Sequence, residues 1–173
     1  MARDPIATTS RVNLSFTWND MGITQRARGA DAQALACFQE ALKLREDLVK
    51  SNPKDVRSAS LLANTRLRIG MTLLRMKRAP EALRLMQTSL QSREQLSARD
   101  PKNSGARAEV GEACAAIADL YIQTQGSTAA REYYRRAYDI FTELKEQGRL
   151  GADFRGEPAR IKAVLDRIDT GVC

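Results

Sequence analysis

The chain has 173 residues, 43% of them hydrophobic and only 5% aromatic, and this supply of small and aliphatic side chains favours one helical domain over a sheet. It has no histidine, which excludes Ser-His and Cys-His nucleophile pairs and removes the most common metal ligand, so we expect neither an enzyme nor a metal or cofactor site. Three widely spaced cysteines and the lack of a membrane-length apolar run predict a soluble, cytoplasmic protein with reduced thiols, while the net charge of +7 could suggest a nucleic-acid or acidic partner.

The strongest feature is a segment that recurs twice, shifted each time by 48 residues. One position in it holds a large side chain in every copy, namely Phe38, Met86 and Tyr134. Each copy contains two stretches whose apolar residues are three and four positions apart, separated by a short break. This spacing is typical of two amphipathic helices joined by a turn, so the sequence predicts three antiparallel helix pairs.

In chain order, residues 1–7 contain an Asp-Pro dipeptide that recurs as Asn52-Pro53 and Asp100-Pro101, and we expect them to be the end of a preceding repeat or a linker. Residues 8–51 form the first repeat. Its first helix starts near Thr8, Thr9 or Ser10, any of which could supply the N-cap. Asp31 is expected to cap the second helix.

The second repeat spans residues 55–99, with Asp55 as N-cap and Pro80 at the first position of its second helix. The third spans residues 103–147, and Ser127 is expected to cap its second helix. A turn-rich loop follows at residues 148–156. Residues 157–173 place apolar side chains at i, i+3, i+4 and i+7, so we predict a helix that caps the open apolar face of the last pair.

The motif W-x-x-M-G-x-x-Q, which starts at Trp18, precedes A-x-x-x-F at Ala34 to Phe38. It resembles the tetratricopeptide pattern W-x-x-L-G-x-x-Y…A-x-x-x-F, and the third copy keeps aromatic residues at Tyr121 and Tyr134. The resemblance covers about residues 8–147. It implies an all-α, right-handed α-α superhelix of three antiparallel helix pairs, completed by the C-terminal capping helix, although a period of 48 is longer than the usual 34 or so.

A second resemblance concerns the D/N-P-x-x joints, the A-L-x-L-R-E-x-L second helix and the ending L-K-E-Q-G-R-L. These are similar to the C-terminal tetratricopeptide regions of bacterial eukaryotic-like serine/threonine protein kinases. The sequence has no glycine-rich loop with a paired lysine, no H-R-D and no D-F-G, so the resemblance implies a regulatory or docking region without phosphoryl-transfer activity.

In tetratricopeptide arrays the first helix of each pair lines a concave groove that commonly receives an extended peptide or a partner helix. The resemblance implies a groove formed by Phe16, Asn19, Ile23, Arg26, Asn64, Leu67, Met71, Arg75, Glu112, Asp119 and Gln123. Such a groove would suit a partner with hydrophobic anchors and acidic residues. Arg26 and Arg75 are expected to pair with its carboxylates, and Ile23 and Met71 to contact its side chains.

Two other functions compete with this one. The positive charge is concentrated in the middle repeat, where Arg66, Arg68, Arg75, Lys77 and Arg78 could contact nucleic-acid phosphates. That repeat lacks aromatic residues for base stacking, so nucleic-acid binding ranks behind protein binding. Self-association into a homodimer through the face of residues 8–28 is the other alternative.

Overall fold

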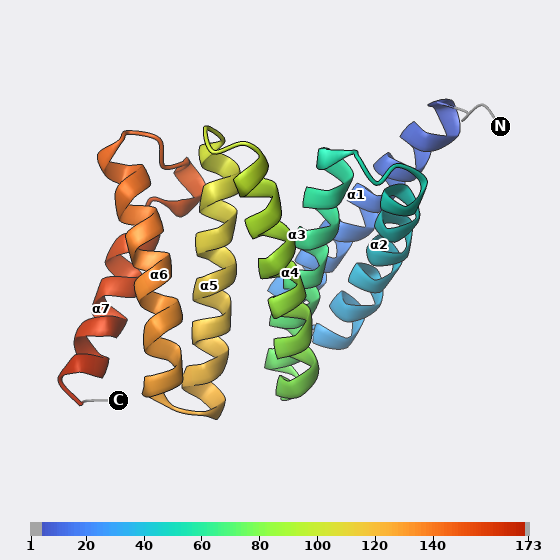
Figure 1. Cartoon of the computed structure of the whole chain (residues 1–173). Coiled ribbons are helices and arrows are strands. Elements are labelled where there is room, and N and C mark those ends of the chain that lie inside the picture. The colour runs from blue at the N-terminus through green and yellow to red at the C-terminus, as the bar shows by residue number, and fades with distance from the viewer. Residues whose placement is uncertain (1–4, 172–173) are drawn as a thin grey trace. The chain divides into compact units, whose positions relative to one another are not determined.

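The computed structural model describes residues 5–171, and all regular secondary structure in that range is helical (Figure 1). The helices are α1 (Pro5–Ala27), α2 (Asp31–Ser51), α3 (Val56–Arg75), α4 (Ala79–Arg99), α5 (Ser104–Thr124), α6 (Ser127–Glu146), the short 3-10 helix η1 (Ala152–Phe154) and α7 (Glu157–Asp169). The predicted all-α fold, with three helix pairs and a capping helix, is confirmed. Residues 1–4, which include the Asp4 of the first Asp-Pro dipeptide, lie outside the described range.

The chain divides into two compact units, one ending at Ser89 and the other beginning at Leu90. The division lies inside α4 rather than at a loop between repeats. In the first unit α1 packs antiparallel to α2, and α2 also packs against α3. In the second unit α5 pairs with α6, and α6 is covered by α7.

A close approach between helices explains the recurring Gly and large residue of the repeat in the first unit. A Cβ atom built on Gly22 would lie only 2.6 Å from ring atoms of Phe38, and one built on Gly70 would lie 2.7 Å from Cγ of Met86. The helix backbones can approach this closely only because the glycines have no side chain. Phe38 and Met86 are both fully buried by this packing.

The second unit is built around the apolar side of α6. Tyr134, Ile140 and Phe141 of that helix are at most 2% exposed. Phe141 stacks on Phe154 of η1 with ring centroids 5.5 Å apart. The apolar stripe of α7 contributes Ile161, which is fully buried, so this helix closes the apolar face of α6 as a cap.

The predicted starts of the first repeat's helices differ from the structure. The helical segment begins at Pro5, so Thr8, Thr9 and Ser10 lie within α1 and do not cap it. An early helical proline is tolerated because the first backbone N–H groups of a helix have no intrahelical acceptor. Asp31 is the first residue of α2 rather than its N-cap, and its carboxylate binds Arg75 of α3 instead.

Among the other helix starts, Asp55 caps α3 as predicted, because its side chain accepts a hydrogen bond from the backbone N–H of Arg57. Pro80 is the second rather than the first residue of α4. Ser127 is the first residue of α6, and the N-cap position belongs to Gly126, whose φ of 86° suits glycine. The expected loop at residues 148–156 contains the short helix η1.

Candidate functional site

The groove residues expected on α1 and α3 differ widely in accessibility. Asn19 and Leu67 are only 7% and 1% exposed, so they belong to the core and not to a ligand surface. Asn19 shares the buried side of α1 with Gly22, which packs on α2. Leu67 lies one turn before Gly70, on the side of α3 that meets Met86. Phe16, Ile23, Arg26, Asn64 and Met71 are half-buried, and Arg75 is exposed.

Two of the expected groove residues meet across α1 and α3. Nη1 of Arg26 lies 3.9 Å from the thioether sulfur of Met71, and both side chains are half-buried. A thioether is a weak hydrogen-bond acceptor. The contact therefore places a basic group beside an apolar one on the same patch of the first unit.

The other polar groups expected in this part of the groove are engaged within the chain. Nε of Arg75 donates to Oδ1 of Asp31 at 2.8 Å, which links α3 to α2. Within α3, Nε of Arg68 donates to Oδ1 of Asn64 at 2.7 Å. A ligand carboxylate would therefore have to compete with Asp31 for Arg75.

The residues expected in the second unit are also mostly engaged. Glu112 accepts from Nη1 of Arg93 at 2.8 Å, and Asp119 accepts from the Tyr134 hydroxyl and from Arg160. Burial and the bond to Asp119 raise the pKa of Tyr134 well above its usual value near 10. Gln123 is exposed near the end of α5.

Two buried arginines, which the sequence analysis did not single out, hold adjacent helices together. Arg45 of α2 is 1% exposed, and its Nη1 donates to the Leu61 carbonyl oxygen at 3.0 Å and to Oγ1 of Thr65 at 2.6 Å. Its Nε donates to Ser15 of α1 at 3.3 Å, and its guanidinium lies 5.4 Å from the centre of the Phe16 ring. Burial, and secondarily the nearby charge of Arg68, lower the pKa of Arg45 to about 10.

Arg93 of α4 stands 48 residues after Arg45 and is also 1% exposed. Its Nη1 donates to the Glu109 carbonyl oxygen, which is equivalent to the Leu61 oxygen at the same shift. The arginine of the A-L-x-L-R-E motif is thus part of the contact between each of these second helices and the first helix that follows it. The 48-residue register was the signal that could have identified both arginines.

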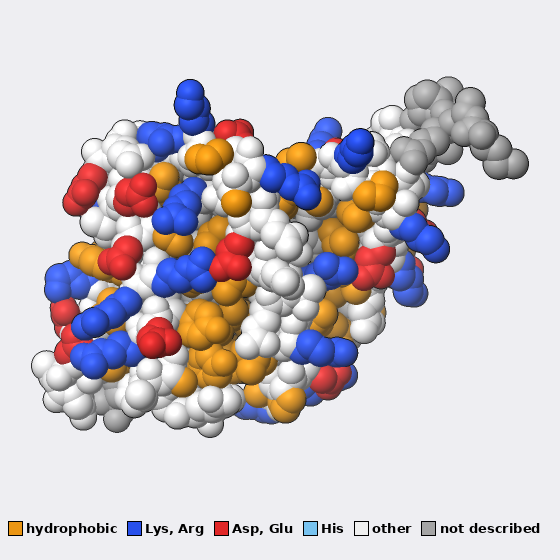
Figure 2. All heavy atoms as spheres, in the orientation of Figure 1, with side chains coloured by type: hydrophobic (Ala, Val, Ile, Leu, Met, Phe, Trp, Pro, Cys, Tyr) orange, Lys and Arg blue, Asp and Glu red, His pale blue; other side chains and the backbone are white. Residues whose placement is uncertain are grey.

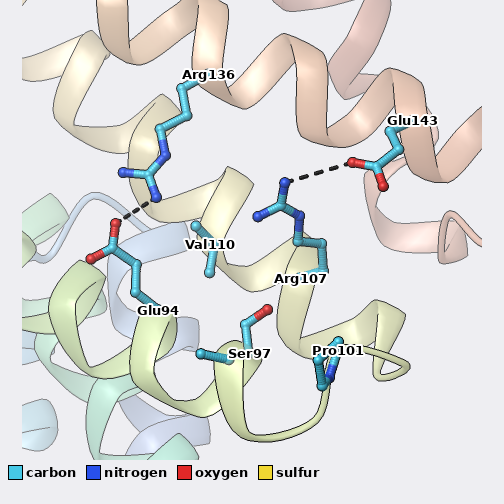
Figure 3. A pocket seen from close by; sticks show the side chains of 8 residues that line it. Glu94, Ser97, Pro101, Arg107, Val110, Arg136 and Glu143 are labelled. Atoms are coloured by element: carbon cyan, nitrogen blue, oxygen red, sulfur yellow. Dashed lines mark ion pairs between the residues drawn. The ribbon is translucent and has the colours of Figure 1, made fainter.

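The second unit also contains a cleft that the sequence analysis missed (Figure 3). It has a volume of about 460 Å³, and its lining is Glu94, Ser97, Ala98, Pro101, Arg107, Val110, Arg136 and Glu143. Arg136 pairs with Glu94, and Arg107 pairs with Glu143 at 3.6 Å, so the charges of the cleft balance one another. On the face that Figure 2 shows, basic and acidic side chains are likewise interspersed. Because its lining comes from three helices and the turn between α4 and α5, no local sequence motif could indicate this cleft.

Neither a metal site nor a membrane helix is found in the described part of the chain. Over residues 5–171, no three side chains of His, Cys, Asp or Glu gather in a way that could hold an ion. None of the helices described in that range is both long and apolar enough to cross a bilayer.

Models of the tetratricopeptide repeat family match residues 62–101 and residues 111–142. Residues 62–142 therefore contain tetratricopeptide repeats, as the recurrence of the repeat predicted. Such repeats generally act as scaffolds for protein–protein interaction and carry no catalytic centre of their own. No curated protein matches the sequence, so the likeness to kinase C-terminal regions stays a prediction.

Proposed function

We propose that this protein is a scaffold that binds an extended peptide or a partner helix along the first helices of its repeats. The observation that most supports the proposal is the contact between Arg26 of α1 and Met71 of α3, which forms one mixed basic and apolar patch from two successive repeats. Ile23 is half-buried on α1, one turn before Arg26, and adds to the apolar part.

The chemistry of the patch favours a ligand that carries an acidic residue next to a hydrophobic anchor. Arg26 would exchange the weak sulfur acceptor of Met71 for a carboxylate, which forms a much stronger charge-assisted bond. The thioether of Met71 would then contact the hydrophobic anchor, a role suited to its flexible and polarisable side chain.

Arg75 would bind a ligand carboxylate only after its ion pair with Asp31 is broken. The side chains of this pair are 52% and 20% exposed, so water screens their attraction. An acidic ligand could then displace Asp31 at small cost, and replacing Asp31 by asparagine should strengthen its binding.

The kinase-like joints and ending lead us to propose further that the scaffold is the regulatory or docking region of a bacterial serine/threonine kinase. The coding sequence around this region tests the idea directly. An adjoining kinase domain in the same reading frame would support it, and an unrelated domain would contradict it.

Nucleic-acid binding receives less support from the side-chain contacts. Three of the five cations considered for it are already in ion pairs: Arg66 with Glu46, Arg75 with Asp31, and Arg78 with Glu81. Each pair reduces the positive field that phosphates would meet.

The test is a peptide-display selection on the immobilised protein, followed by fluorescence anisotropy with the selected peptide. We expect an acidic and hydrophobic consensus and a loss of affinity of about tenfold or more in the Arg26→Gln, Arg75→Gln double variant. The matched control is the Arg11→Gln, Arg28→Gln double variant, which removes the same charge from one exposed position of α1 and one in the turn after it. Equal affinity for the two double variants would contradict the proposal.

A further inference from the structure

Helix α1 carries an exposed stripe that repeats a buried stripe of α3. The α1 stripe consists of Ser10, Leu14, Thr17, Met21 and Thr24, and all five residues are exposed. The equivalent residues of α3, shifted by 48, are Ser58, Leu62, Thr65, Ile69 and Thr72, and all five are buried. Four of the five positions hold identical residues. The same side chains are thus in the core in one repeat and at the surface in the other.

The contacts of α3 show what such a stripe is suited to bind. Helix α2 packs on α3 and inserts Arg45, whose Nη1 donates to the Leu61 oxygen and to Oγ1 of Thr65. Thr65 itself donates to the Leu61 oxygen at 2.9 Å, so a carbonyl and a hydroxyl oxygen together form the acceptor of the guanidinium. The contact between α2 and α3 thus combines burial of apolar side chains with a charge-assisted hydrogen bond.

Helix α1 presents the same acceptor towards solvent. Thr17 donates to the carbonyl oxygen of Asn13 at 3.2 Å, which reproduces the Thr65–Leu61 arrangement, and both residues are exposed. Leu14 and Met21 flank this acceptor and are 48% and 44% exposed. In α3 the corresponding Leu62 and Ile69 are only 6% and 3% exposed.

The second unit repeats the carbonyl part of this contact, with the carboxylate of Glu112 as the second acceptor in place of a hydroxyl. Arg93 of α4 donates to the Glu109 oxygen of α5, and Val110 and Ile117, the counterparts of Leu14 and Met21, are at most 1% exposed. An arginine-bearing second helix therefore occupies this position on both α3 and α5.

We propose that the α1 stripe is a docking surface for an amphipathic helix of a partner protein, with an arginine between leucines as in the A-L-x-L-R-E-x-L motif of α2. This surface is separate from the patch around Arg26 and Met71. The partner helix must have an arginine that is available to donate to the α1 stripe. A second copy of this chain does not supply one, because Arg45 and Arg93 already donate to α3 and α5. The third second helix, α6, has Phe141 where the others have arginine.

The test titrates the whole protein with a synthetic peptide of residues 31–51 in which Cys37→Ser prevents disulfide formation. The peptide contains no tryptophan, and Trp18, the single tryptophan of the protein, lies beside Thr17 on α1, so its fluorescence reports binding. We expect a saturable change in Trp18 emission. An Arg45→Gln substitution in the peptide should weaken binding about tenfold or more, because it removes a charged hydrogen-bond donor.

Variants of the protein locate the binding surface. Thr17→Val should weaken binding of the arginine peptide by several-fold, whereas Thr124→Val removes the hydroxyl of an exposed residue at the end of α5 and should have no effect. Neither change touches a core position, and circular dichroism checks that both variants fold. The Arg26→Gln, Arg75→Gln double variant should bind this peptide normally, which separates the stripe from the proposed peptide groove.

Two results would overturn the proposal. Equal affinity for the arginine and glutamine peptides, or an unchanged affinity in Thr17→Val, would mean that the peptide binds elsewhere, for instance by displacing α2 from α3. A concentration-dependent dimer that Met21→Lys dissociates would assign the stripe to a second copy of the chain instead.

Discussion

Arg45 in the first unit and Arg93 in the second stand at the same position of the repeat, but the protein satisfies the two side chains differently. Arg45 donates through Nε and Nη1 to neutral oxygens of Ser15, Leu61 and Thr65. Arg93 has an ion pair with Glu112, yet its Nε and Nη2 are buried without a hydrogen-bond partner. A buried guanidinium can thus be held by neutral oxygens alone.

The comparison teaches that an ion pair is a poor guide to the importance of a buried charge. The attraction between Arg93 and Glu112 is offset by the cost of taking the guanidinium out of water. Hydrogen-bond satisfaction should matter more, because each buried N–H group without an acceptor costs free energy.

The largest effect should come from truncating the two arginines. We expect Arg45→Ala to lower the free energy of unfolding by about 3–5 kcal/mol, since it leaves a cavity and removes three hydrogen bonds. Arg93→Ala should cost less, about 1–3 kcal/mol, because it also removes the two buried nitrogen atoms, Nε and Nη2, that have no hydrogen-bond partner. Urea denaturation measures both. A larger loss for Arg93→Ala would reverse the comparison, and Arg84→Ala, at an exposed position of α4, serves as the control.

The ion pair itself can be tested separately. We expect Glu112→Gln to destabilise the protein by about 1–2 kcal/mol, because the buried guanidinium of Arg93 loses its carboxylate while Glu112 is partly solvated. The matched change Glu40→Gln removes an exposed pair with Lys43 and should cost no more than about 0.5 kcal/mol. Thermal or urea unfolding of both variants measures the difference, and equal losses would show that burial adds nothing to the Arg93 pair.

The large residue of each repeat offers a comparison in alkaline solution. Tyr134 is buried with a raised pKa, whereas Phe38 at the equivalent position has no hydroxyl. The folded state favours the neutral phenol, so its stabilising contribution is present below pH 10 and is lost as the pH rises above that value, by at most about 1.4 kcal/mol per pH unit. Tyr134→Phe should therefore flatten the decline of melting temperature between pH 9 and 11. Tyr138→Phe, which removes the hydroxyl of a half-buried tyrosine of the same helix, is the matched control.

The smallest effect concerns the turns within repeats. Lys77 has a φ of 62°, and Gly29 holds the equivalent position in the first repeat with a φ of 77°. A left-handed conformation costs a lysine more than a glycine, so Lys77→Gly should stabilise the protein by about 0.5–1 kcal/mol. Differential scanning calorimetry measures the change. A lower melting temperature would show that the lysine side chain contributes more than its backbone strain costs.

The architecture could be predicted from the sequence because the features that determine it lie within a single repeat. The glycine and large residue at each crossing, the apolar spacing of the helices and the cap at Asp55 all act within one repeat. The contacts that differ from the prediction connect residues far apart in the chain. Asp31 has the chemistry of an N-cap, but Arg75, 44 residues later, binds its carboxylate.

The candidate site was harder to predict for the same reason. Asn19 is a polar residue with no local sign of burial, and the structure places it in the core. Arginines are expected at the surface, and nothing in the local sequence marks Arg45 and Arg93 as buried. Which charges are available to a ligand depends on such pairings, and these follow from tertiary packing.

Phe141 makes the last second helix of the chain different from the two before it. It occupies the position of Arg45 and Arg93, lies against Gly111 and stacks on Phe154, so α6 makes an aromatic contact where the earlier second helices donate hydrogen bonds. Duplicating a repeat after α6 would bring a new first helix against a surface that offers it no guanidinium. Lengthening of the array by gene duplication is therefore compatible with the α1 side and would require replacement of Phe141 on the other.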